Sequence, residues 1–267
     1  MVVFNPSGKR LPEVLVEVVR SEMRVNRHGF SFHAVIGDDV VLRTLDRGTY
    51  LNELKSITGK APRLLHIHLR LASAGVINGE NIHMWKVGRY HISHNGSVAS
   101  FACADEHYLY QYPYRSRPNL QCDTKSDTLK LIESPEFIKA VDSLDSRPRE
   151  LWNVLKRFGF YGVMFMTSKD EVVAVSVNKP LYIYATKHLL IFVNEPIEFV
   201  KPVKRFGFKL DLSTVPYTSY RNVMIRYDIK KMKPLFFKPK STKPWPKPWH
   251  ELGYDYLEDW RWSQWSK

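Results

Sequence analysis

The side chains best suited to chemistry in this sequence are five histidines that fall close together in the chain. Imidazole nitrogens bind metal ions and exchange protons near neutral pH, so such a group could form a metal site. However, His66 and His68 alternate along a run that also holds Leu64 and Ile67, which is typical of a buried strand. We therefore predict no metal ion and no cofactor. The five are His66, His68, His83, His91 and His94.

Four short polar motifs follow one another in the same part of the chain. Each is weak alone, because Asn-Gly is common in hairpin turns and Ser-Asp before an apolar run is a common helix cap. Their order is much more specific. The motifs are His68-Leu69-Arg70-Leu71-Ala72-Ser73-Ala74-Gly75, Asn81-Ile82-His83, His94-Asn95-Gly96 and Ser126-Asp127-Thr128.

The ordered set resembles the glutaminase domain of class II glutamine amidotransferases, which are N-terminal-nucleophile (Ntn) hydrolases. That family carries H-x-R-x-A-[ST]-x-G, N-x-H, H-N-G and S-D-[ST] in the same order. The resemblance covers roughly residues 1–200. It implies an α+β fold, a four-layer α-β-β-α sandwich of two mainly antiparallel sheets.

The catalytic nucleophile of that family is missing at the matching position. In the family it is a cysteine that follows the initiator methionine, and its own α-amino group acts as the base. Here position 2 is Val2, which has no nucleophilic atom, and the first cysteine in the sequence is Cys103. Cys103 and Cys122 stand in the wrong part of the pattern and have no α-amino base. The resemblance therefore implies a pseudoenzyme with no intact catalytic residue.

The resemblance assigns other pocket residues position by position. Arg70 matches the arginine that binds the substrate α-carboxylate, and Asp127 matches the carboxylate that holds the α-ammonium. Asn95 and Gly96 match the oxyanion-hole pair, and Ser73 matches a small hydroxyl residue of the site. Two alternatives stay open. Arg70 and Asp127 could form a structural ion pair, and Asn95-Gly96 could be kept only because a turn needs positive φ.

Hydrophobic periodicity predicts the elements that must position these residues. We predict helices over 11–25, 50–57, 126–132, 135–144 and 149–158. We predict strands over 30–36, 40–45, 64–71, 90–94, 98–103, 161–167, 171–177, 181–185 and 189–193. Asn95-Gly96 is expected to be the hairpin turn between two of these strands. Because most strands connect as hairpins, we expect largely antiparallel sheets.

The positive charge of the chain is concentrated in its last quarter. The 267 residues have a formal net charge of +13, and residues 201–250 hold 13 basic against 2 acidic side chains. This segment is also rich in proline and tryptophan. We therefore predict a glutamine amidotransferase type 2-like domain over 1–200 and a basic, Pro- and Trp-rich C-terminal extension over 201–267. The prolines disfavour a regular helix or central strand, so we expect an extended arm.

The extension offers lysines and tryptophans that could contact a partner. We expect it to place the protein in an assembly, through a protein partner or self-assembly. The alternative is nucleic-acid binding through 230–250, with lysines on phosphates and aromatic rings stacked on bases. For the pocket, the alternatives are a sensor of a glutamine-like amino acid or an active amidohydrolase with a different nucleophile. The contact candidates are Lys238, Lys240, Lys243, Trp245, Lys247 and Trp249.

Composition excludes two other classes of protein. No run of apolar residues is long enough to span a membrane, so we expect no membrane partner. Two cysteines exclude a disulfide-rich scaffold. We expect a reducing, cytoplasmic setting, or the virion and host cytoplasm if the source is viral.

Overall fold

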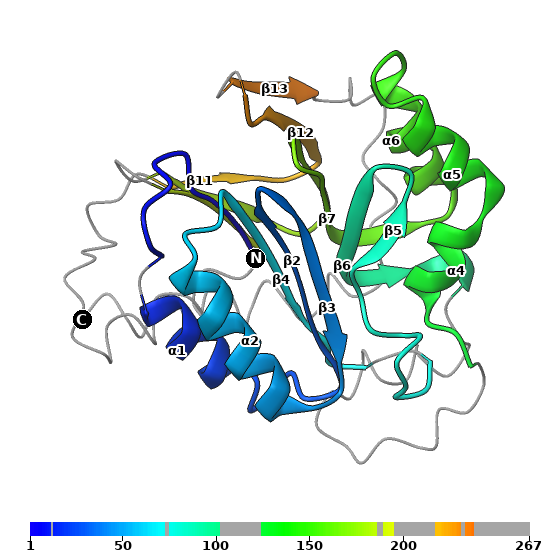
Figure 1. Cartoon of the computed structure of the whole chain (residues 1–267). Helices are drawn as coiled ribbons and strands as arrows, with labels where there is room; N and C mark the ends of the chain where they lie inside the picture. Colours follow the sequence, from blue (N-terminus) through cyan, green and yellow to red (C-terminus); the bar gives the residue numbers. More distant parts are fainter. Residues whose placement is uncertain are drawn as a thin grey trace, which may run out of the picture.

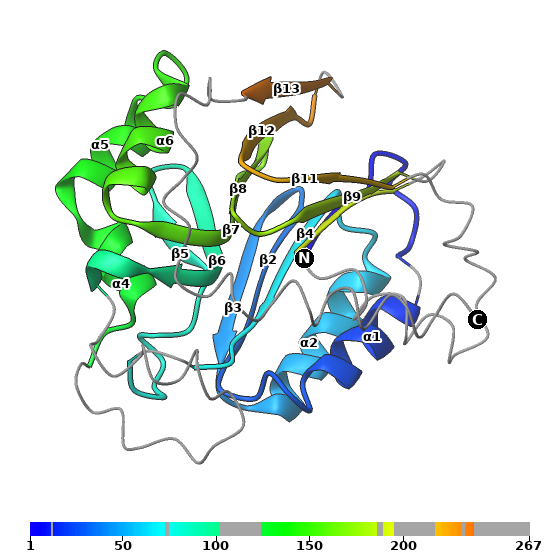
Figure 2. The same cartoon turned by 180° about the vertical axis from the view of Figure 1, so that it is seen from behind.

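The computed structural model of the chain describes residues 1–11, 13–72, 75–101, 124–185, 189–194, 217–230 and 233–237. Two antiparallel sheets lie face to face, and helices cover the outer face of each sheet (Figure 1, Figure 2). This is the α-β-β-α sandwich that the sequence predicted. No helix in these ranges is both long enough and apolar enough to cross a membrane.

The first sheet has seven strands in the order β11-β9-β10-β1-β4-β2-β3. Helices α1 (Val14–Glu22) and α2 (Arg47–Gly59) cover it. Tyr50 of α2 is fully buried against Phe30 and Phe32, and its hydroxyl donates a hydrogen bond to the Ser31 carbonyl at 3.2 Å. The strands are β1 (Val2–Phe4), β2 (Phe30–Ile36), β3 (Asp38–Thr44), β4 (Leu64–Leu69), β9 (Leu181–Ala185), β10 (Leu190–Val193) and β11 (Tyr217–Tyr220).

The second sheet has six strands in the order β13-β12-β8-β7-β6-β5. Helices α4 (Asp127–Glu133), α5 (Pro135–Asp142) and α6 (Pro148–Arg157) cover it, and a 3-10 turn, η1 (Ala99–Phe101), follows β6. Ser126 and Ser134 cap α4 and α5 by accepting backbone N–H groups. The strands are β5 (Trp85–Val87), β6 (Tyr90–Val98), β7 (Phe160–Thr167), β8 (Glu171–Val177), β12 (Val223–Asp228) and β13 (Lys233–Phe237).

The two-residue period of the strands separates the core into layers. On β4, Leu65 and Ile67 pack toward the helices, whereas Leu64 belongs to the layer between the sheets. His66 shares the inner face with Leu64. The inner layer is thus apolar at one end and carries buried histidine, serine and threonine side chains at the other.

The predicted hairpin at Asn95-Gly96 is wrong. Strand β6 runs unbroken from Tyr90 to Val98, and its residues from His91 to Val98 pair with β7. Gly96 lies opposite Gly162 in this pairing, so the glycine serves close approach of two strands and not a turn.

The shift in composition near residue 200 does not mark the end of the sheets. Strand β11 joins the first sheet, and β12 and β13 join the second. Val223 and Ile225 of β12 are buried in the layer between the sheets. Pro234 lies in β13, an edge strand, where a missing N–H is tolerated. The sequence-based boundary at 200 therefore placed three strands outside the fold to which they belong.

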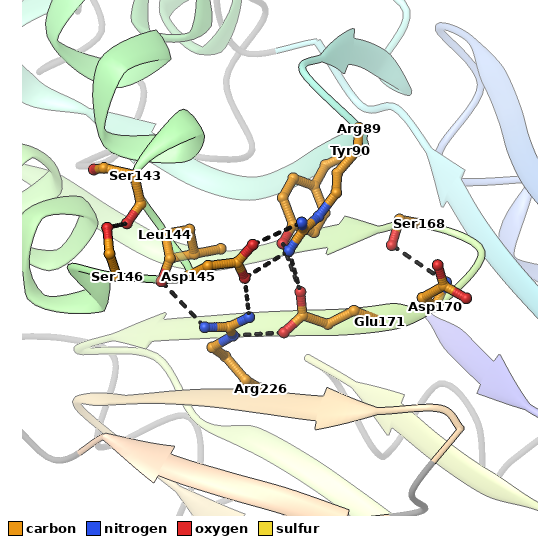
Figure 3. A network of polar contacts seen from close by, with 10 residues as sticks. All are labelled: Arg89, Tyr90, Ser143, Leu144, Asp145, Ser146, Ser168, Asp170, Glu171 and Arg226. Atoms are coloured by element: carbon orange, nitrogen blue, oxygen red, sulfur yellow. Dashed lines mark hydrogen bonds and ion pairs between the residues drawn. The ribbon is translucent and has the colours of Figure 1, made fainter.

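A network of ion pairs fastens β12 to its neighbours (Figure 3). Arg226 of β12 donates to Glu171 at 2.5 Å and to Asp145 at 2.7 Å. Glu171 also accepts from the Tyr90 hydroxyl at 2.5 Å, and Arg89 contacts both acids. Glu171 is almost fully buried, so its charge depends on these donors. The network joins β12, β8, the start of β6 and the loop after α5.

Candidate functional site

A cavity of about 380 Å³ lies between β4 of the first sheet and β6 of the second. It brings together four of the residues that the sequence predicted: Arg70, Asn95, Gly96 and Asp127. Ser73 lies outside the described residues, and so do the predicted contacts of the extension. The latter are Lys238, Lys240, Lys243, Trp245, Lys247 and Trp249.

The start of the chain reaches this cavity. Met1 lines it, and the Met1 α-amino group donates to the Ile67 carbonyl at 2.9 Å. Val2, the predicted nucleophile position, does not line the cavity, and its side chain is fully buried in the apolar layer between the sheets. Neither residue supplies a thiol or a hydroxyl group.

Arg70 follows β4 and is held by backbone carbonyl groups. Its guanidinium donates to Val76 at 3.2 Å and to Gly75 at 3.4 Å, and only 3% of the residue is exposed. Burial lowers the pKa of Arg70 to about 10, against the opposing effect of the Asp127 carboxylate. The guanidinium therefore remains charged at neutral pH and can bind a carboxylate.

Asp127 is the first residue of α4, and it ties that helix to β6. One carboxylate oxygen accepts the Val98 N–H at 2.7 Å, and the other accepts the Thr128 N–H at 2.7 Å and its hydroxyl at 3.2 Å. Burial raises the pKa of Asp127, while these hydrogen bonds act in the opposite direction. A carboxylate has about four acceptor positions. Residues in the described part of the chain use three of them, so the fourth is open to a ligand.

Asn95 and Gly96 contribute differently to the cavity wall. The half-buried Asn95 amide has no hydrogen-bond partner among the described residues and is available to a ligand. Gly96 has a φ of 152°, and a Cβ there would collide with the Tyr161 carbonyl and lie 2.7 Å from the Gly162 Cα. The strand pairing therefore demands glycine at this position, whatever the cavity binds.

The histidines of the motifs mainly support the cavity wall. His94 contacts the Thr128 hydroxyl at 2.9 Å and the Tyr161 carbonyl at 3.2 Å, and burial lowers the pKa of its imidazole to about 3. His68 stacks on His83 with ring centroids 3.8 Å apart. Burial lowers the pKa of His68 to about 3. These rings are therefore neutral at physiological pH.

Other residues of the cavity were missed by the sequence interpretation, among them Ser93 and Lys179. Ser93 lines the cavity, and its Oγ lies 2.7 Å from His66 Nε2. The sequence could have indicated Ser93, because side chains two residues apart on a strand lie on the same face, and Asn95 follows two residues later. Lys179, from the turn between β8 and β9, adds a positive charge to the lining.

No protein-family model matches the sequence, and no curated protein matches it. Solved structures do match. The glutamine phosphoribosylpyrophosphate amidotransferase from B. subtilis, complexed with ADP and GMP, superposes with a TM-score of 0.52 at 13% identity. A second, described as an allosteric regulatory enzyme of purine biosynthesis, gives a TM-score of 0.56 at 13% identity. Each match covers 88% of this chain and 48% of the other.

The chain has the Ntn-hydrolase-like fold. The neighbours confirm the predicted architecture and its likeness to glutamine amidotransferases. This chain spans about half the length of both neighbours. At this identity the likeness concerns the fold, and the function has to be argued from the cavity.

Proposed function

We propose that the chain is a catalytically inactive, glutamine amidotransferase-like protein whose cavity binds a glutamine-like amino acid. One observation carries the proposal. Arg70, Asn95 and Asp127 line a single cavity together with Met1, and the expected nucleophile position is the buried Val2, which has no thiol or hydroxyl group. The cavity thus offers charged and polar side chains that support amino-acid binding. It lacks the nucleophile that the resemblance leads us to expect.

The lining carries charges of both signs, with Glu22 of α1 and Asp127 as its acidic residues, and these charges suit the two ends of an amino acid. Arg70, Lys179 and the Met1 α-amino group supply positive charge for an α-carboxylate. The remaining acceptor position of Asp127 suits an α-ammonium. The amide of Asn95 can donate to the side-chain carbonyl of glutamine or to the carboxylate of glutamate. A volume of about 380 Å³ accommodates one such molecule.

Calorimetry and an ammonia assay on the full chain test both halves of the proposal. We expect L-glutamine or L-glutamate to bind, D-glutamine to bind more weakly, and no ammonia to be released. Asn95→Ala should weaken binding about three- to tenfold, because it removes one hydrogen-bonding side chain. The matched control is Asn153→Ala on the exposed face of α6. Absence of heat at millimolar ligand would overturn the binding proposal, and steady ammonia release would overturn the inactivity.

A second candidate function rests on the contact between Ser93 and His66. A serine hydroxyl 2.7 Å from an imidazole nitrogen, at the wall of a cavity, has the geometry of a nucleophile and its base. Burial and the nearby Met1 α-amino group lower the pKa of His66 well below its usual value, which makes it a weak base. The inactive assignment is therefore preferred.

The same ammonia assay separates the two candidates. An amidohydrolase that uses Ser93 would lose its activity in Ser93→Ala and keep it in Ser97→Ala, which changes another serine of β6. Activity that survives both variants would contradict the Ser93 assignment.

We further propose that the segment beyond β13, residues 238–267, connects the protein to an assembly. Its lysines and tryptophans support this role. The oligomeric state of the full chain, compared with a chain ending at residue 237, tests self-assembly. Salt-dependent binding of single-stranded or duplex DNA that disappears in the shorter chain would instead favour nucleic acid.

A further inference from the structure

A separate group of metal-binding side chains lies where the β2–β3 hairpin meets β6 of the other sheet. His33, Asp39 and His91 each place a potential ligand atom within 4.8 Å of the other two. His33 Nε2 lies 3.0 Å from Asp39 Oδ1, and the rings of His33 and His91 have centroids 4.2 Å apart. None of the three lines the cavity described above.

One atom of this group is left without a partner. The Nδ1 atom of His91 is buried and has no hydrogen bond within the described part of the chain, and only 6% of the residue is exposed. A buried polar atom without a partner is unfavourable. Within the described part of the chain no group uses this nitrogen, so it is available to a water molecule or to a metal ion.

Neighbouring groups hold the histidine rings in place for such a ligand. The Nδ1 atom of His33 contacts the Thr167 hydroxyl at 2.9 Å, which fixes the ring orientation. The Asp39 side chain is 42% exposed, so it can rotate, and water can reach the site. Lys86 of β5 lies opposite His91, and its positive charge would oppose a bound cation. Because Lys86 is exposed, solvent screens this repulsion.

We propose that His33, Asp39 and His91 bind one divalent first-row transition-metal ion, such as Zn²⁺, with water completing the coordination. Imidazole and carboxylate ligands suit these ions. Bonds of 2.0–2.2 Å place tetrahedral ligand atoms about 3.3 Å apart, so a small movement of Asp39 and the rings closes the site. The ion would join the two sheets. Of the five histidines that the sequence analysis weighed, only His91 belongs to this group.

A chain of hydrogen bonds leads from this site to the cavity. Thr167 Oγ1 contacts His33 Nδ1 at 2.9 Å and His66 Nδ1 at 2.8 Å, and His66 Nε2 contacts Ser93 Oγ at 2.7 Å. Without metal, the Asp39 carboxylate can only accept, so His33 carries its proton on Nε2. Thr167 then donates to His33 Nδ1, His66 donates from Nδ1 to Thr167, and Ser93 donates to His66 Nε2.

We expect metal binding to exchange donor and acceptor in each hydrogen bond between His33 and Ser93. The ion takes the Nε2 lone pair of His33, which moves the His33 proton to Nδ1. In this state Thr167 accepts from His33 and has two acceptors within reach, His66 Nδ1 at 2.8 Å and the His91 carbonyl at 3.4 Å. We expect it to donate across the shorter contact, so that His66 donates from Nε2 to Ser93. The number of protons on the four groups is unchanged. In this state His66 Nε2 carries a proton and cannot accept one from Ser93. His66 therefore cannot activate Ser93 as a nucleophile while the metal is bound.

Titration of the full chain with Co²⁺, followed by its visible absorption, tests the site, with Zn²⁺ as competitor. We expect one ion per chain. Asp39→Asn and His91→Gln should each weaken binding by at least about tenfold. The matched control is Asp38→Asn, which changes the neighbouring exposed carboxylate and should bind as the unaltered protein does. Circular dichroism confirms that each variant is folded.

Two outcomes would overturn the proposal. One is absence of binding at millimolar Co²⁺, and the other is binding that neither Asp39→Asn nor His91→Gln weakens. Nitrogen NMR of the imidazoles tests the coupling separately. Zn²⁺ should move the His66 proton from Nδ1 to Nε2 in the unaltered protein and not in Asp39→Asn. An unchanged His66 tautomer with metal bound would reject the coupling.

Discussion

Gly96 of β6 lies directly opposite Gly162 of β7, and the backbones of the two strands approach too closely for a side chain at either position. Gly96 also forms part of the cavity wall. The same residue therefore sets the strand spacing and the shape of the site.

We predict that Gly96→Ala destabilises the protein by about 3 kcal/mol or more. The new methyl group meets the Tyr161 carbonyl and the Gly162 backbone, neither of which can rotate away. Urea unfolding measures the change in the free energy of unfolding. The control is Gly79→Ala, where nothing lies within 4 Å of the added atom, and we expect a change of about 0.5 kcal/mol or less. Equal effects of the two variants would contradict the close approach.

A second prediction concerns the network of Figure 3. Arg226→Met should cost about 2–4 kcal/mol of stability, because it leaves the buried Glu171 carboxylate with fewer donors. Lys230→Met removes an exposed ion pair with Asp170 and should change stability by at most about 1 kcal/mol. Chemical unfolding of both variants gives the comparison. A cost for Arg226→Met as small as that for Lys230→Met would show that the network contributes little.

The same network predicts a dependence of stability on pH. Hydrogen bonds from Arg89, and to a smaller extent from Arg226, lower the pKa of Asp145 to about 2 in the folded protein, below the usual value of about 3.9. Its ionised form therefore stabilises the fold above about pH 4, and this contribution is lost as the pH falls toward about 2. Asp145 is mostly exposed, so salt should reduce the effect. Urea midpoints of the unaltered protein and Asp145→Asn should differ at pH 5 and converge near pH 2. A difference that does not change with pH would reject this explanation.

Truncation tests where the folded part of the chain ends. A chain that stops at residue 237 should unfold cooperatively, because it keeps β11, β12 and β13. A chain that stops at residue 200 should lose cooperative unfolding, since it exposes the inner layer that Val223, Ile225 and Tyr227 cover. Near-ultraviolet circular dichroism during heating distinguishes the two. Cooperative unfolding of the shorter chain would support the compositional boundary instead.

Much of the secondary structure could be predicted from local patterns. The strand over Glu171–Val177 agrees residue for residue with its prediction, and α1 lies inside the predicted helix over 11–25. Helix α2 begins earlier than predicted because Asp46 caps it, accepting the Thr49 N–H at 2.6 Å. Local periodicity and caps determine such elements, so one sequence suffices to find them.

The order of the motifs also indicated which residues would share a cavity. Arg70, Asn95, Gly96 and Asp127 do line one. Their individual roles depended on packing. Asp127 uses three of its acceptor positions within its own fold, whereas the Asn95 amide has no hydrogen-bond partner among the residues that the structure describes. A motif places a side chain at a site without showing how many of its hydrogen bonds the protein itself uses.

By itself, the sequence indicated most of the helices and strands up to residue 193 and four residues of the cavity, and the order of its motifs pointed to the Ntn-hydrolase-like architecture. The tertiary structure alone decided that Asn95-Gly96 lies within a strand and that residues 217–237 complete both sheets. It also decided that His33 and His91 meet between the sheets. These features depend on pairing and packing between segments far apart in the chain. Local sequence propensities do not determine which strands pair with one another.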